Sequence, residues 1–103
     1  MSIQKIAVLG AGQMGNGITQ VAACAGYEVT MIDIQQDYVD NGMAAIQKSL
    51  AKLVSKERMS QPEADAALSR ITSSIDRRSA ADADLVVEAI PEIPDLKFST
   101  FAE

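Results

Sequence analysis

The chain has 103 residues, a length that accommodates one domain and is too short for two. A net charge of −5 argues against nucleic acid or an anionic membrane as the main partner, and no apolar run is long enough to span a bilayer. The single cysteine excludes an intramolecular disulfide and favours a reducing compartment, so we expect the protein in the cytoplasm.

The first third of the chain predicts a strand, a helix and a second strand. Residues 3–9 form an apolar run typical of a strand buried on both faces. A glycine-rich turn follows, and apolar residues then recur at helical spacing up to Gly26, where a helix would end. Residues 28–33 predict the second strand. The apolar residues of this helix are Ile18, Val21, Ala22 and Ala25.

The remainder of the chain predicts two more helices, two more strands and the beginning of a last helix. Asp37 is the expected N-cap of a long amphipathic helix. Residues 61–68 predict a shorter helix, 71–75 a strand near a sheet edge, and 83–89 a buried strand. The pattern from Asp95 onward is helical. The apolar residues of the long helix are Val39, Met43, Ile46, Leu50 and Leu53.

The resulting order, β-α-β-α-α-β-β-α, predicts an α/β fold with a parallel sheet and right-handed crossovers. We expect a Rossmann-type doubly wound sheet, of which residues 1–103 supply about four strands. A complete sheet of this kind usually has about six strands, so we expect the chain to be the N-terminal part of a longer domain.

A glycine motif, Gly10-Ala11-Gly12-Gln13-Met14-Gly15, lies between the first predicted strand and the first predicted helix. It has the form GxGxxG, and its position within a βαβ unit gives each glycine a physical role. Gly10 permits a tight turn, Gly12 lets the backbone approach a pyrophosphate, and Gly15 lets the helix pack closely on the strand. The first-turn amides then face the phosphates, which predicts dinucleotide binding.

Asp33 ends the second predicted strand, where its carboxylate can accept hydrogen bonds from the ribose hydroxyls of adenosine. The same charge repels a 2′-phosphate, and Ile34, Gln35 and Gln36 include no arginine to receive one. We therefore predict NAD as the cofactor rather than NADP. A glycine turn that merely packs beside a surface acid is the structural alternative.

Residues 10–33 resemble the opening of the 3-hydroxyacyl-CoA and 3-hydroxybutyryl-CoA dehydrogenases, whose glycine loop reads GxGxMGxGIxQ. Residues 84–92 are similar to the fourth strand of that family and the loop after it, and 96–103 to the following helix. The resemblance covers nearly the whole chain. Its motifs are specific because they are separated and correctly spaced.

The resemblance implies where the ligands would bind. A serine and a lysine of the family that contact coenzyme A match Ser49 and Lys56, in a helix whose lysines recur every four residues. Such a row of lysines is usually a solvated face, and Glu92 and Lys97 are equally compatible with a surface pair. The implied cofactor residues are Gly10, Ala11, Gly12, Gln13, Met14, Gly15, Asp33, Ala89, Ile90, Glu92 and Lys97.

The resemblance also implies an oxidoreductase of fatty acid metabolism that passes hydride from the 3-hydroxyl of an acyl-CoA to NAD. The family uses a histidine oriented by a glutamate, and this chain has no histidine, so no residue here is assigned a catalytic role. No metal is expected. We expect the catalytic pair, the remaining strands and a helical domain with homodimer contacts to follow Glu103, and the 103-residue chain alone to be inactive.

Two alternatives remain open. One is the NAD(P)-binding domain of a β-hydroxyacid dehydrogenase, a family that shares the methionine in the glycine loop but often has an arginine after the second strand. The other is a stand-alone NAD-binding module without catalysis, which the absence of a catalytic residue favours.

Overall fold

The computed structural model describes residues 3–89 and 97–99, which form one five-stranded sheet in the order β3-β2-β1-β4-β5. The strands are β1 (Lys5–Leu9), β2 (Glu28–Ile32), β3 (Ile71–Ser74), β4 (Leu85–Glu88) and β5 (Lys97–Ser99). The helices are α1 (Gln13–Cys24), α2 (Gln36–Ser55), α3 (Gln61–Ser69) and the 3₁₀ helix η1 (Arg77–Ala80). β1 to β4 are mutually parallel, which confirms the predicted α/β sheet.

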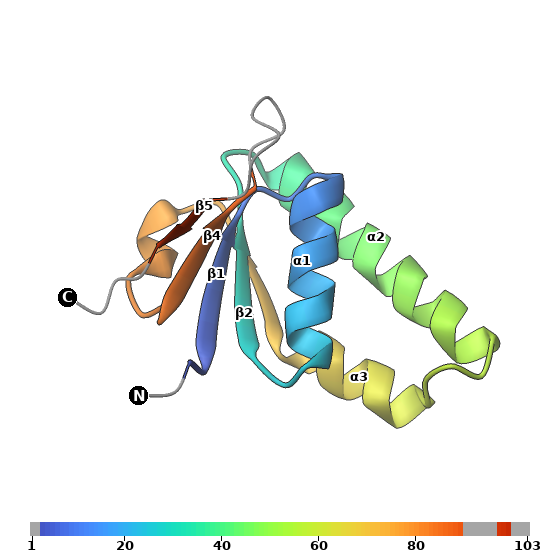
Figure 1. The fold of residues 1–103 in the computed structure, drawn as a ribbon. Coiled ribbons are helices and arrows are strands. Elements are labelled where there is room, and N and C mark those ends of the chain that lie inside the picture. Colours follow the sequence, from blue (N-terminus) through green and yellow to red (C-terminus); the bar gives the residue numbers. More distant parts are fainter. Residues whose placement is uncertain (1–2, 90–96, 100–103) are drawn as a thin grey trace.

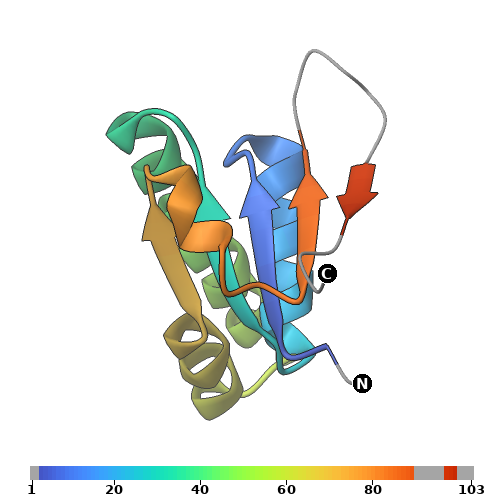
Figure 2. The ribbon, with the colours of Figure 1, turned by 90° about the vertical axis from the view of Figure 1, so that its left-hand side faces the viewer.

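The helices cover the two faces of the sheet unequally. α1, α2 and α3 lie on one face, whereas η1 lies against the other (Figure 1). Figure 2 views the sheet from the side of η1 and shows the four parallel strands ending at one edge, where α1 and α2 begin. Within the described residues, no helix combines the length and apolarity needed to cross a membrane.

The main core fills the space between the sheet and α1, α2 and α3, and a smaller core lies under η1. Side chains alternate between the two faces of a strand, so neighbouring residues of β1 enter different cores. Ala7 and Val8 are 1% and 0% exposed, as the unbroken apolar run predicts for a strand buried on both faces. The main core includes Ile6, Val8, Val29, Met31, Val39, Ile46, Leu50, Ile71 and Val87.

Two details of the helices differ from the sequence prediction. The N-cap of α2 is Gln35, and Asp37 instead lies in the first turn, where its charge still complements the helix dipole. In α1, Val21 is 70% exposed, because the helix packs closely on the sheet through smaller residues. The buried residues of α1 are Gly15, Thr19 and Ala23.

The helix predicted from Asp95 onward is wrong for residues 97–99, which form β5. This strand pairs antiparallel with β4, with Phe98 opposite Val87. Pairing satisfies backbone groups that the edge of β4 would otherwise leave open, whereas a short helix is marginally stable without packing. The other residues of the predicted helix lie outside the described residues.

Asp84 joins the amino ends of β1 and β4. Its Oδ2 accepts hydrogen bonds from the backbone N–H groups of Gln4 and Lys5, at 2.9 and 3.0 Å. These two bonds, assisted by the charge of Lys5, hold the pKa of Asp84 below its ordinary value of 3.8. The folded state is thereby coupled to the ionisation of this carboxyl.

We predict that Asp84→Asn lowers the urea midpoint of unfolding at neutral pH. Because the folded-state pKa of Asp84 is depressed, its stabilisation is present above the unfolded-state pKa and is lost as pH falls through the folded-state pKa. The deficit of the variant should therefore shrink as the solution is acidified below pH 3.8. Asp82→Asn, at a neighbouring exposed carboxylate, is the control. A deficit of the same size at every pH would contradict this account.

Candidate functional site

The glycine loop between β1 and α1 leaves no space for a side chain at two positions. Gly10 has a φ of +120°, and a Cβ there would collide with the carbonyl oxygen of Ala89, directly after β4. A Cβ at Gly15 would collide with the carbonyl oxygen of Gly10. The start of α1 therefore lies directly against the ends of β1 and β4.

The first turn of α1 is open to a ligand. Its N-cap, Gly12, has no side chain to form a capping hydrogen bond, and the turn contains no acidic residue. Gln13 and Met14 are exposed beside it. Because the first N–H groups of a helix have no partners within the helix, they are available to an anion at this end.

The carboxylate of Asp33 is fixed beside the glycine loop. Its Oδ2 accepts a hydrogen bond from the N–H of Ala11 at 2.9 Å, and its Oδ1 accepts one from the N–H of Ile34 at 2.7 Å. The N–H of Gly10 donates to the carbonyl of Ile32 at 2.7 Å, which ties the loop to β2. The structure thus brings together the two elements that the sequence singled out.

A cleft of about 620 Å³ opens at this edge of the sheet, and its walls are mainly apolar. The volume is within the range of about 300–1,000 Å³ that is usual for cofactor sites. The loop, β2, α2, η1 and β4 all contribute to its walls. The lining residues are Leu9, Gly10, Ala11, Gly12, Ile32, Asp33, Ile34, Tyr38, Asn41, Arg77 and Glu88.

Several residues of the cleft were not predicted as site residues. Ile34 and Tyr38 present apolar surface at the start of α2, being 75% and 46% exposed. Glu88 lies opposite Leu9 at the carboxyl end of β4. Because ligands bind at the carboxyl ends of parallel strands, the predicted strand could have indicated Glu88 as a site residue. No local sequence signal marks Arg77 as a cleft residue, because its position depends on how β3 pairs with β2.

Gly42 brings α2 against the glycine loop. A Cβ there would lie 2.8 Å from the carbonyl oxygen of Ala11 and 2.9 Å from the Cε of Met31. A glycine inside a helix costs about 1 kcal/mol relative to alanine, so its position reflects close packing rather than helix propensity. A glycine inside a predicted helix was therefore the sequence signal for this close contact between α2 and the loop.

The predicted cofactor residues after β4 are only partly described. Ala89 is buried, and its carbonyl oxygen fills the space that a Cβ at Gly10 would need. Ile90 and Glu92 lie outside the described residues. Lys97 is the first residue of β5, at the edge of the sheet beyond β4.

The predicted coenzyme A residues lie along α2, away from the cleft. Ser49 is half-buried, and Lys56 is the exposed C-cap of the helix. At the usual rise per residue, they are about 20 and about 30 Å from the start of α2. Neither lines the cleft.

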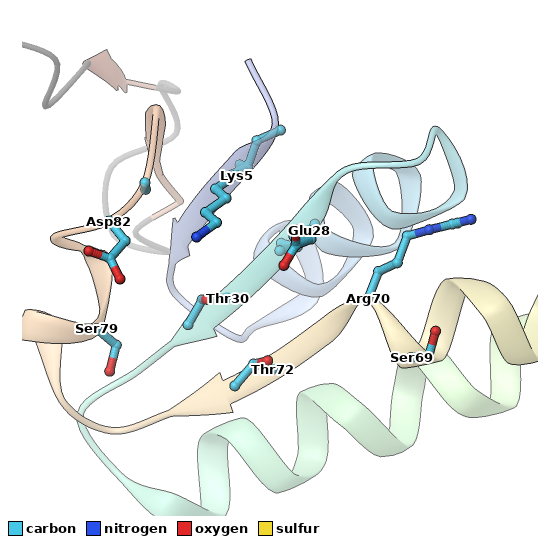
Figure 3. Close-up of a pocket in the computed structure, with 11 residues that line it drawn as sticks. Lys5, Glu28, Thr30, Ser69, Arg70, Thr72, Ser79 and Asp82 are labelled. Atoms are coloured by element: carbon cyan, nitrogen blue, oxygen red, sulfur yellow. The ribbon is translucent and has the colours of Figure 1, made fainter. Parts of the chain in front are cut away.

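A second hollow, of about 400 Å³, lies on the face of the sheet opposite α1, α2 and α3 (Figure 3). Thr30 and Thr72 are paired on neighbouring strands there, and Lys5 and Glu28 bring opposite charges. None of the predicted binding residues lines it. Among the residues that the structure describes, no group of acidic, cysteine or histidine side chains is placed to hold a metal ion.

We predict that Gly15→Ala destabilises the fold by about 1–3 kcal/mol, because the added methyl forces the loop away from the helix. Gly17→Ala is the matched control in the same helix, since nothing lies within 4 Å of its added Cβ. That control should be neutral or stabilising by up to about 1 kcal/mol. Urea unfolding of both variants measures the difference, and equal changes in their free energies of unfolding would refute the tight contact.

Comparison with known proteins identifies the domain. Residues 5–103 match the family described as 3-hydroxyacyl-CoA dehydrogenase, NAD binding domain. A 3-hydroxybutyryl-CoA dehydrogenase of Bradyrhizobium diazoefficiens is 44% identical over 101 residues, which cover 98% of this chain and 34% of the relative. A relative of the same name from Mycobacterium tuberculosis is 40% identical, with 99% and 36% covered. The chain thus spans about a third of the length of these curated relatives.

The fold agrees with the sequence comparison. The crystal structure of (S)-3-hydroxybutyryl-CoA dehydrogenase from Ralstonia eutropha matches with a TM-score of 0.86 at 38% identity. The match covers 89% of this chain and 32% of that one. The chain therefore belongs to the family of NAD-binding domains of 3-hydroxyacyl-CoA dehydrogenases.

Proposed function

We propose that the chain binds NAD in the cleft at the carboxyl edge of the sheet, as part of an enzyme that oxidises 3-hydroxyacyl-CoA, with 3-hydroxybutyryl-CoA as the representative substrate. The observation that carries the proposal is the junction of the glycine loop with Asp33, where the Ala11 amide donates to the carboxylate at 2.9 Å. A backbone open to phosphate and a carboxylate suited to ribose lie side by side there.

The pyrophosphate of NAD would lie against the start of α1. Gly12 lets it approach the backbone, and the amides of Gln13, Met14 and Gly15 would donate to its oxygens. No acidic residue in the first turn opposes its charge. The helix dipole adds to the attraction.

The adenosine half would lie over the end of β2. A carboxylate has about four lone-pair sites, and the amides of Ala11 and Ile34 use two of those of Asp33. The remaining sites would accept hydrogen bonds from the ribose hydroxyls. The exposed apolar surface of Ile34 and Tyr38 would contact the adenine ring.

The nicotinamide half would then lie over β4, because the strand order is β2-β1-β4 and the pyrophosphate crosses β1. This direction fits the proposed roles of Ala89, Ile90, Glu92 and Lys97, which follow β4 in the sequence. NAD supplies hydride acceptance when bound. The residues of this chain bind and orient the cofactor, and with no histidine among the 103 we assign none of them the substrate proton.

Coenzyme A would contact the outer part of α2. Ser49 and Lys56 are seven residues apart and so share one face of the helix. Lys52 lies between them, in a chain of net charge −5, and gives this face a local positive charge for phosphate groups.

Two further parts of the proposal concern the whole protein. We propose that it forms a homodimer through contacts outside residues 1–103. We also propose a cytoplasmic location, which is supported by Cys24, the only cysteine, because it is an exposed free thiol.

NADH titration of the protein at its natural full length tests the site. We expect Asp33→Ala to lower NADH affinity by about tenfold or more, because a charged hydrogen-bond acceptor is lost. Asp37→Ala is the matched control, since Asp37 lies in the first turn of α2 and does not line the cleft. Equal losses in the two variants would contradict the assignment of Asp33.

The proposed activity has its own readout. The natural full-length protein should form NADH when 3-hydroxybutyryl-CoA and NAD are supplied, and residues 1–103 alone should not. Turnover by the 103-residue chain, or none by the natural protein, would overturn this part of the proposal.

A further inference from the structure

Arg77 brings a positive charge into the cleft that holds Asp33. It comes from η1, after β3, yet it lines the same cleft as Asp33, Ile34 and Tyr38. The residues directly after Asp33 offer no such charge. The cleft therefore receives an arginine from η1 rather than from the segment that follows Asp33.

Hydrogen bonds fix η1 beside the end of β2. The N–H of Asp33 donates to the carbonyl of Ser74 at 3.2 Å, which extends the pairing of β2 with β3. The Oγ of Ser74 lies 2.7 Å from that of Ser79. Asp76 caps η1 by accepting a hydrogen bond from the N–H of Arg78 at 2.9 Å. The backbone that carries the cleft arginine is thus held at both ends of this short helix.

The two neighbouring arginines of η1 have different surroundings. Arg78 forms an ion pair with Asp76 at 2.9 Å, and its side chain is 91% exposed. Within the part of the chain that the structure describes, Arg77 forms no ion pair. Asp33 accepts hydrogen bonds from two backbone amides and does not pair with it. The guanidinium of Arg77 is therefore available to a ligand in the cleft.

A dinucleotide whose ribose contacts Asp33 presents its 2′ position at this end of the cleft. Asp33 repels a phosphate at that position, whereas a guanidinium binds phosphate through two parallel hydrogen bonds. On a 2′-phosphate bound there, the two side chains would therefore act in opposite directions. Their balance decides how strongly the cleft discriminates between the two cofactors.

We propose that Arg77 is a specificity-determining residue, which contacts the adenosine half of the dinucleotide and gives the cleft an affinity for 2′-phosphorylated cofactor that Asp33 alone would exclude. NAD remains the preferred cofactor, but the preference is smaller than the position of Asp33 suggests. This inference rests on the proposed function, since both require the dinucleotide in this cleft.

The test is a set of NADH and NADPH titrations of the natural full-length protein, followed by nucleotide fluorescence. Arg77→Ala should lower NADPH affinity by about tenfold or more and NADH affinity by about threefold or less. Arg78→Ala, the adjacent arginine that does not line the cleft, should change neither. Asp33→Asn should raise NADPH affinity, and adding Arg77→Ala to it should remove that gain.

The outcomes separate the two proposals. If wild-type protein binds NADH but Arg77→Ala changes both affinities by the same factor, or neither, the role of Arg77 is refuted. Comparing Asp33→Asn with the double variant Asp33→Asn/Arg77→Ala tests the role of Arg77 even where wild-type binding of NADPH is too weak to measure. The role of Arg77 would also be refuted if the double variant kept the higher NADPH affinity of Asp33→Asn. It would be refuted as well if the Asp33→Asn protein bound NADH but not NADPH. Wild-type protein that fails to bind NADH would instead overturn the proposed function.

Discussion

A methyl group at Gly15 would collide with the carbonyl oxygen of Gly10, and one at Gly10 would collide with the carbonyl oxygen of Ala89. These backbone contacts hold α1 against the ends of β1 and β4. Gly42 does the same for α2, whose backbone reaches Ala11. Two glycines of the loop and a third in α2 therefore let the loop, two helices and two strands converge at one edge of the sheet, where the cleft opens.

The charges at this edge follow from that convergence. α1 starts without a capping side chain, so its amides face outward, and Asp33 is held beside them by the Ala11 amide. The fixed negative charge of Asp33 lines the same cleft as Gly12, the N-cap of α1, an arrangement that suits a ligand with both hydroxyl and phosphate groups. Arg77 adds the opposite charge from η1. In our proposal, these opposite charges let the cleft distinguish one end of a dinucleotide from the other.

Much of the fold was predictable from the sequence, because its signals are local. The apolar run of β1, the glycine motif, and Asp33 at the end of β2 are each read from adjacent residues, and the structure brings the motif and Asp33 together. Arg77 could not be predicted in this way, since its position depends on strand pairing. Residues 97–99 were wrongly predicted to be helical, because pairing with the edge of β4 outweighs their local pattern. Ser49 and Lys56 stay predictions that only a ligand can test.

We propose that the dinucleotide binds where the glycine loop meets Asp33. Backbone amide NMR of the natural full-length protein during titration with NAD can locate the binding site, because it reports on the whole backbone at once. We expect the largest chemical-shift changes at the amides of Gly12, Gln13 and Asp33. Shifts confined to the opposite sheet face around Thr30 and Thr72, with the loop amides unchanged, would contradict it.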